Sequence, residues 1–297
     1  MNITISGASG LVGRHLMRVL GNAGHKLHVL SRHAGTNLPS GVKLTVWDAN
    51  SLPPLASLEN ADAVIHLAGE PVAQRWTAAT RRRIRDSRVG STERLVEALS
   101  RLPRAPAVLV CASAVGYYGS RGDEILVEPS PAGSGFLPEV CVAWEQAAQA
   151  ASRLGSRVTL IRIGVVLDSR GGALGRLLAP FRAGVGGRLG SGRQWMSWIH
   201  VGDLVELFRF AIEVPLPGAV NGVAPFPVSN KEFTQEVARA LKRPALLPVP
   251  EFVLKALLGD MAEILLASQR VSPRAAESAG FRFRFPQLGP ALADLLA

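Results

Sequence analysis

A chain of 297 residues, 47% of them hydrophobic and 19% charged, has the composition of an ordered globular protein with a large core, which excludes a disordered chain. Its two cysteines, Cys111 and Cys141, exclude a disulfide framework and lack metal-site spacing. No apolar stretch reaches membrane-spanning length, and the sequence opens on an expected strand rather than a signal peptide. We therefore expect a cytoplasmic protein without a metal or a membrane partner.

The net charge of +10 comes almost wholly from arginine, because only five of the 33 basic residues are lysine. The densest basic run is Arg81-Arg82-Arg83, with Arg85 and Arg88 just beyond it. It lies in an expected helix, without interleaved aromatic residues and without a nucleic-acid motif. A solvated helix face that attracts anionic ligands is favoured over a nucleic-acid surface.

The first 32 residues predict a strand, a glycine turn, a helix and a second strand. A β-branched run over 2–6 indicates a buried strand, and apolar residues at helical spacing from 11 to 20 indicate the helix. Between them stand Gly7, Gly10 and Gly13. In a dinucleotide-binding turn, such glycines allow a tight turn, close approach of a pyrophosphate, and close packing of helix and strand. A glycine-rich turn without a ligand is the alternative.

The second strand ends at Arg32, where NAD-binding proteins carry an acidic residue for the ribose 2′-OH. Arginine suits a 2′-phosphate instead, so NADP is predicted over NAD, with an ordinary surface arginine as the alternative. Asp48 follows the third expected strand, at 42–47. It is predicted either to bind the adenine amino group or simply to form a turn.

Further strands are expected at 63–67, 107–112 and 157–163, with helices at about 77–102 and 137–154. This alternation predicts an α/β fold, a Rossmann-type doubly wound parallel sheet. Ligands bind at the C-terminal ends of such strands. The candidates at these ends are Leu67, Ala68, Gly69, Glu70, Ser113, Tyr117, Tyr118, Arg162 and Gly164.

The alternation of strands and helices stops near Asp168. We expect residues 1–165 to form the nucleotide-binding domain, to which 198–224 returns. The segments 166–197 and 225–297 then form a smaller, mostly helical substrate part. Within the returning segment, Asp203 is expected to cap a helix that runs through Ala211.

With these residues in view, the chain resembles the extended short-chain dehydrogenase/reductases. More narrowly, it resembles the atypical, NAD-dependent epimerase/dehydratase-like group called epimerase family proteins. The segments that carry the resemblance are 4–13, 64–69, 113–119, 141–145, 190–203, 247–250, 258–261 and 280–281. The resemblance covers nearly the whole chain and implies a small C-terminal domain. It also adds Ser9, Leu11 and Val12 to the glycines as cofactor contacts and suggests, by analogy alone, a homodimer.

The superfamily's chemistry depends on a Ser and a Tyr-x-x-x-Lys pair, in which the Lys lowers the Tyr pKa and holds the nicotinamide ribose. Ser113 matches the Ser. The pair is missing, because Leu137 and Cys141 stand where it is expected and no Lys occurs between Lys43 and Lys231. The chemistry must therefore use other groups, or the protein binds NADP without turnover.

Tyr117 and Tyr118 are the substitute catalytic candidates beside Ser113, with one of the two tyrosines in the core as the alternative. Glu70 is either a base in a desolvated site or a surface acid. Arg193 is either a clamp for an anionic or sugar-like substrate or a plain loop residue.

Three further residues are expected to be structural. Glu145 is expected to bond a neighbouring arginine, and Cys141 to be a small buried residue. His200 is expected to form, with Asp203, a buried hydrogen-bonding corner.

The sequence thus predicts an NADP(H)-dependent oxidoreductase- or epimerase-like enzyme with a non-standard acid/base set. Its substrate is expected to be a small polar or sugar-like molecule. The alternative is a catalytically weak or inactive NADP-binding sensor or scaffold, which the missing pair favours.

Overall fold

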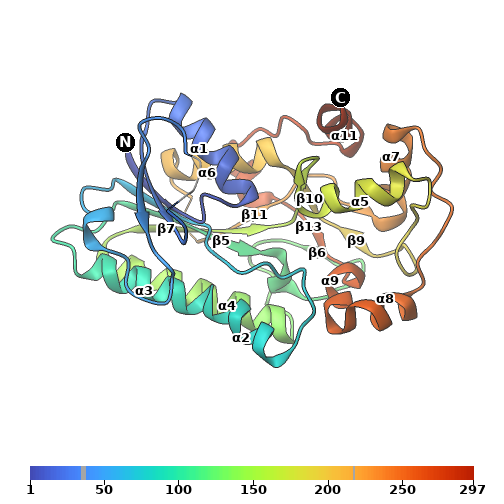
Figure 1. The fold of residues 1–297 in the computed structure, drawn as a ribbon, viewed down its shortest axis with the longest axis horizontal. Helices are drawn as coiled ribbons and strands as arrows, with labels where there is room; N and C mark the ends of the chain where they lie inside the picture. Colours follow the sequence, from blue (N-terminus) through green and yellow to red (C-terminus); the bar gives the residue numbers. More distant parts are fainter. Residues whose placement is uncertain (35–37, 217) are drawn as a thin grey trace.

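The computed structural model describes residues 1–34, 38–216 and 218–297. Its centre is a sheet of seven strands in the order β11-β7-β5-β4-β1-β2-β3 (Figure 1). Every pairing in this sheet is parallel, which confirms the predicted Rossmann-type fold. The strands are β1 (Asn2–Ser6), β2 (Lys26–Ser31), β3 (Lys43–Val46), β4 (Ala63–His66), β5 (Val108–Ala114), β7 (Arg157–Ile163) and β11 (Gly218–Gly222).

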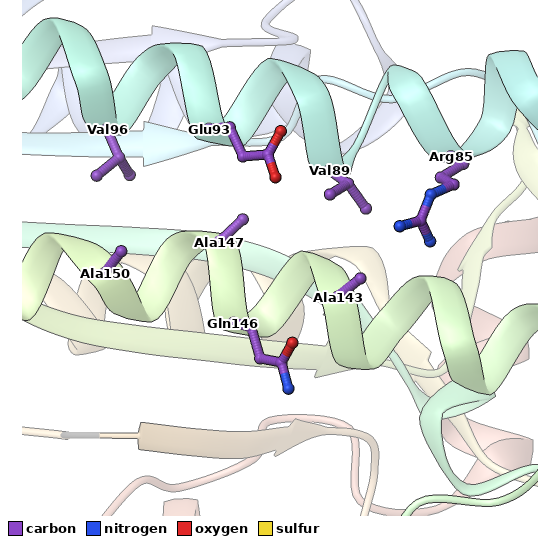
Figure 2. Close-up of a pocket in the computed structure, with 8 residues that line it drawn as sticks. All are labelled: Arg85, Val89, Glu93, Val96, Ala143, Gln146, Ala147 and Ala150. Carbon is purple, nitrogen blue, oxygen red and sulfur yellow. The ribbon is translucent and has the colours of Figure 1, made fainter.

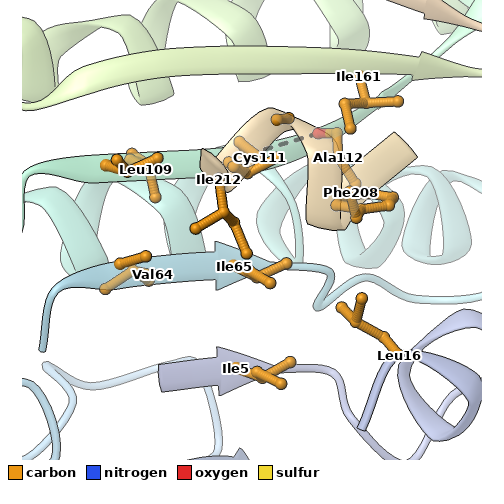
Figure 3. Packing of buried hydrophobic residues seen from close by; sticks show 14 of the residues in the cluster. Ile5, Leu16, Val64, Ile65, Leu109, Cys111, Ala112, Ile161, Phe208 and Ile212 are labelled. Carbon is orange, nitrogen blue, oxygen red and sulfur yellow. Dashed lines mark hydrogen bonds between the residues drawn. The ribbon is translucent and has the colours of Figure 1, made fainter. Parts of the chain in front are cut away.

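Helices cover both faces of the sheet. On one face lie α1 (Leu11–Asn22) and α6 (Val201–Glu213), and on the other lie α3 (Val89–Ser100) and α4 (Phe136–Gln149) (Figure 1). The central strands are therefore buried on both faces and read as continuous apolar runs. Between β4 and the α1/α6 layer, Ile65 packs near Leu16 and Ile212 (Figure 3).

The remaining elements build the C-terminal part. Helices α5 (Gly172–Arg182), α7 (Asn230–Leu241) and α11 (Leu288–Leu296) pack around a second apolar cluster, which includes Leu178, Trp198 and Phe233. The main core also includes Ala276 and Phe281 from this part of the chain. The other elements are α2 (Ala78–Asp86), α8 (Glu251–Leu258), α9 (Ala262–Leu266), α10 (Arg274–Ser278) and the short strands β6 (Ile125–Leu126), β8 (Val165–Asp168), β9 (Trp195–Met196), β10 (Trp198–His200), β12 (Val228–Ser229) and β13 (Arg270–Val271).

Three sequence predictions need correction. β11 was not expected, although it lies within the segment predicted to return to the sheet. The single helix expected at 77–102 is two helices, α2 and α3, because Ser87 and Arg88 turn toward the loop after β4 and bond Glu70. Helix α6 is capped by His200, whose ring accepts the Gly202 N–H, and not by Asp203.

A groove of about 470 Å³ runs along the outer face of the α3/α4 layer (Figure 2). It is lined by Arg85, Val89, Glu93 and Val96 from one side and by four residues of α4 and the turn after it from the other. The groove is on the flank of the molecule, away from the ends of the strands, so it is not the ligand site expected for this fold. Among the described residues, no helix is long and apolar enough to span a membrane.

Candidate functional site

The turn between β1 and α1 is shaped by close contacts of its own backbone. Gly7 has a φ of +73°, and a Cβ there would lie 2.6 Å from the carbonyl carbon of Leu67. A Cβ at Gly13 would lie 2.5 Å from the Cα of Ala8. Both positions exclude a side chain, so the tight turn and the close helix packing predicted from the sequence are present.

The N-terminus of α1 follows this turn and is open. Gly10 is the N-cap residue, and no side chain of a described residue caps the helix. The first backbone hydrogen bond into the helix runs from the Arg14 N–H to the Gly10 carbonyl. The preceding N–H groups of Leu11, Val12 and Gly13 therefore lack intrahelical acceptors. Ser9 and Gly10 are exposed, which leaves the helix end accessible to an anion.

Beside this turn, the loop after β4 brings an acid between two arginines. Glu70 is 3.9 Å from the guanidinium of Arg32, at the end of β2, and 4.0 Å from that of Arg83, on α2. The side chains of Arg32 and Arg83 are 64% and 55% exposed. Both guanidinium groups are therefore available to an anionic ligand at the edge formed by β2 and β4. Glu70 is paired rather than isolated in an apolar pocket, which weakens its case as a base.

Asp48, at the end of β3, forms a turn. Its carboxylate accepts hydrogen bonds from the N–H of Asn50 and from Ser51. These bonds, the Asn50 N–H foremost, lower the pKa of this exposed carboxyl. Of the two alternatives for Asp48, the structure shows the turn, and adenine binding stays a prediction.

A buried ionic network lies behind the end of β5. The Ser113 hydroxyl donates to Glu145 Oε1 at 2.6 Å. Glu145 in turn accepts two hydrogen bonds of 2.8 Å from the guanidinium of Arg162 on β7. Burial acts to lower the Arg162 pKa, but its bonds and charge interaction with Glu145 raise it above its usual value. The prediction that Glu145 bonds a neighbouring arginine is confirmed.

The two tyrosines differ. Tyr118 is fully enclosed; its hydroxyl donates to Asn221 Oδ1 at 2.7 Å and accepts from Arg162 Nη1 at 3.0 Å. Burial raises the pKa of Tyr118. Tyr117 is half-buried and lies with its ring 3.5 Å from the Arg162 guanidinium carbon. In the described part of the chain, no hydrogen bond is formed by the Tyr117 hydroxyl.

The structure places two of the predicted site residues in the interior. Tyr118, a catalytic candidate, takes the position of the core tyrosine that the sequence left as the alternative, and Arg162, the predicted cofactor contact, is also buried; both are bonded to protein groups, and their roles in the site stay predictions. Arg162 is only 4% exposed, and its Nη1 also donates to the Glu128 carbonyl. Ser113 is also buried, at 3% exposure, and bonded to Glu145, so the half-buried Tyr117 is the more accessible of the remaining catalytic candidates.

The other predicted site residues at the strand ends also differ in their exposure and in what surrounds them. Leu67, Ala68 and Glu70 are half-buried after β4, whereas Gly69 is exposed. Gly164, after β7, lacks a side chain because a Cβ there would lie 2.5 Å from the Ser197 carbonyl oxygen. Packing therefore explains this glycine without a cofactor. Arg193 is exposed in its loop, and its role as a substrate clamp stays a prediction.

Two further predictions are confirmed. Cys141 is buried, and its surroundings, burial first, raise the pKa of its thiol to about 12, so it is no nucleophile at neutral pH. His200 and Asp203 are buried and hydrogen-bonded, and the Asp203 carboxylate accepts the N–H groups of Arg284 and Phe285.

Sequence reasoning missed a buried histidine beneath the site. His66, the last residue of β4, bonds the hydroxyls of Ser6 and Ser91, and burial lowers its pKa from 6.5 to about 4. It stays neutral in the folded protein while the unfolded chain takes up a proton below pH 6.5. Stability is therefore fully retained above pH 6.5, falls as the pH drops toward 4, and then levels off.

This histidine predicts a pH dependence of folding. Between pH 7 and pH 5, His66 should lower the free energy of unfolding by about 2 kcal/mol. Urea denaturation of the wild-type protein and of His66→Gln at both values measures this effect, since the variant lacks only this titrating group. Equal pH dependence in both proteins would show that His66 titrates normally.

Comparison with known proteins gives the family. Residues 3–223 match the NAD dependent epimerase/dehydratase family, and residues 249–295 match a domain of unknown function (DUF1731). The chloroplastic homologue of epimerase family protein SDR39U1 from Arabidopsis thaliana is 39% identical over 308 residues, covering 100% of this chain and 87% of the relative. An epimerase family protein of Mycobacterium tuberculosis is 43% identical over 295 residues, covering 98% of this chain and 96% of the relative.

Solved structures agree with this. The human epimerase family protein SDR39U1, crystallised with NADPH, superposes with a TM-score of 0.89 at 36% identity and covers 100% of this chain and 99% of its own. A nucleoside-diphosphate sugar epimerase from Corynebacterium glutamicum has a TM-score of 0.81 at 37% identity, covering 100% of this chain and 58% of its own. The chain belongs to the NAD dependent epimerase/dehydratase family, among its epimerase family proteins.

Proposed function

We propose that this protein binds NADP(H) across the C-terminal ends of β2, β1, β4 and β5. The observation that carries the proposal is the open N-terminus of α1 behind a turn in which Gly7 and Gly13 exclude side chains. Backbone N–H groups there would hold the pyrophosphate, because a helix N-terminus offers unpaired donors and a positive dipole end. The NADPH complex of human SDR39U1 supports the choice of coenzyme.

The preference for NADP over NAD is proposed from Arg32 and Arg83. Their exposed guanidinium groups converge on Glu70 and would bind a 2′-phosphate at the end of β2. Glu70 fixes the two arginines but also competes with the phosphate for them. NAD has no such phosphate and gains nothing from this pair of charges.

The coenzyme assignment is tested by fluorescence titration with NADPH and NADH. Arg32→Ala should weaken NADPH binding about tenfold and leave NADH binding unchanged, because one charge-assisted contact to the phosphate is lost. Arg82→Ala, an exposed arginine of the same region, is the matched control and should change neither affinity. Tighter binding of NADH than NADPH by the wild-type protein would overturn the proposed preference.

We further propose that the bound coenzyme serves a redox or epimerase-like reaction on a small polar or sugar-like substrate. Tyr117 and Ser113 are the polar groups at the end of β5, and the sugar-nucleotide epimerase of Corynebacterium glutamicum supports this substrate class. Tyr117 is the better proton-transfer candidate because its hydroxyl has no bond to a described residue.

A sensor or scaffold is the second candidate, favoured by Leu137 and Cys141 at the positions of the usual catalytic pair. Incubation of the protein with deuterated NADPH and a panel of carbonyl compounds and sugar nucleotides separates the two. Transfer of deuterium to any compound identifies an enzyme. Tight coenzyme binding with no transfer across the panel identifies a sensor.

A further inference from the structure

Arg88 occupies an unusual place between the sheet and its flanking helices. It stands at the turn between α2 and α3, and its Nη1 donates to the carbonyl oxygens of Glu70, at 2.9 Å, and Ile84, at 3.2 Å. Its guanidinium also lies against Gly69, where a Cβ would be 3.2 Å from the guanidinium carbon. The charge is therefore held at the C-terminal end of β4, inside the proposed coenzyme site.

The same guanidinium also faces α4. Its carbon lies 5.4 Å from the centre of the Trp144 ring, one turn of helix beyond Cys141. The charge of Arg88 acts on the Cys141 thiol and opposes the rise of its pKa that burial causes. Cys141 itself packs near Gly116, in the loop after β5. Arg88 thus brings a positive charge, from a different helix, close to Cys141, which stands where the usual catalytic pair carries its lysine.

The Arg88 guanidinium has N–H donors that its hydrogen bonds to the protein do not use. Both of its hydrogen bonds use Nη1, and within residues 1–34, 38–216 and 218–297 no acceptor bonds its Nε or Nη2. Neither nitrogen is a fully buried unpaired atom, so both keep some exposed surface. Burial lowers the pKa of Arg88, but an arginine stays charged at neutral pH.

We propose that Arg88 takes over the role of the missing lysine as the group that holds the ribose next to the nicotinamide. The inference rests on the proposed coenzyme site. The free N–H groups of Arg88 donate to the ribose hydroxyls, while Nη1 keeps the guanidinium fixed on the Glu70 and Ile84 carbonyls. Arg32 and Arg88 therefore bind opposite halves of the coenzyme, and of these two arginines Arg32, not Arg88, distinguishes NADP from NAD.

The test measures three ligands against Arg88→Met: NADPH, NADH and 2′,5′-ADP, which carries the adenosine half alone. The variant should weaken NADPH and NADH by the same factor, about 10- to 100-fold, because it loses charge-assisted hydrogen bonds common to both. Binding of 2′,5′-ADP should stay at the wild-type value. Arg85→Met is the matched control, since Arg85 lies three residues earlier in the outer groove (Figure 2) and should leave all three affinities unchanged.

Two charge-retaining variants complete the design. Arg88→Lys should keep most of the affinity, and Cys141→Lys added to Arg88→Met should restore part of it by supplying the charge from α4. Thermal unfolding is recorded for each variant so that affinities are compared among folded proteins. The proposal is overturned if folded Arg88→Met binds NADPH and NADH as tightly as Arg85→Met does, if folded Arg88→Lys loses as much affinity as Arg88→Met, or if Arg88→Met loses 2′,5′-ADP binding as well. A wild-type protein that binds neither coenzyme would instead refute the proposed function.

Discussion

Replacing Arg162 by methionine should lower the free energy of unfolding by about 4 kcal/mol, the largest loss expected from a single charge removal in this chain. The loss is expected because the substitution leaves the carboxylate of Glu145 buried without its ion-pair partner. Glu145 is buried, and without Arg162 its carboxylate keeps, among the described residues, the Ser113 hydroxyl as its one hydrogen-bond donor. The ring of Tyr117 also loses the cation on which it lies. Urea denaturation at pH 7 measures the change.

Two comparisons separate this effect from a general loss of charge. Glu97 and Arg101 form an exposed pair on α3 and the turn after it, so Glu97→Gln should cost less than about 0.5 kcal/mol. Adding Glu145→Gln to Arg162→Met removes the uncompensated carboxylate and should restore about half of the lost stability. A double variant no more stable than Arg162→Met would show that lost packing, rather than the buried charge, dominates.

The second large effect is expected at Gly13. A methyl group there would press against the Cα of Ala8 and, at 2.6 Å, the carbonyl oxygen of Gly7. Neither backbone atom can move without opening the turn or shifting α1 away from β1. Gly13→Ala should therefore destabilise the protein by about 3 kcal/mol and, under the proposed function, weaken NADPH binding. Thermal unfolding and fluorescence titration measure the two losses.

The same helix provides the control. Gly21 lies in the last turn of α1, and a Cβ there would meet no atom within 4 Å. Gly21→Ala should stabilise the protein by about 0.5 to 1 kcal/mol, because alanine favours the helix and loses less backbone entropy on folding. If Gly13→Ala is as stable as Gly21→Ala, then the contact between α1 and the turn is looser than the structure indicates.

Local patterns predicted the parts of the fold that depend on local chemistry. The β-branched run of β1, the glycine turn and the apolar spacing of α1 lie within 20 residues of one another and need no distant partner. β11 is different, because Gly218–Gly222 contains two glycines and an asparagine and has little strand propensity. It forms a strand because β7 offers it a parallel edge, which no window of sequence reveals.

The candidate site, like the fold, has features that local sequence predicts and features that depend on distant residues. Candidates at strand ends could be named in advance, because parallel strands carry their ligands there. The sequence could not predict which of these candidates face a ligand, because the orientation of each side chain depends on contacts with residues far away in the sequence. Tyr118 is buried by its bond to Asn221, 103 residues away, and Arg162 is bonded to Glu145 on another element. The sequence shows Arg88 only as one arginine near a basic run, whereas the structure places its guanidinium against Gly69, at the end of β4.

The contacts of β13 and its neighbours decide whether the C-terminal part is a separable module. β13 pairs with β6, the Ser272 carbonyl accepts from Asn221, and the Ala275 N–H donates to Glu128. Phe281 completes the apolar core of the sheet. The segments 3–223 and 249–295 match two families, yet residues of the second pair with and pack against residues of the first. Although two family models match these segments, the contacts between them lead us to expect that they unfold together, and that a chain cut between them would leave Asn221 and Glu128 without these hydrogen bonds.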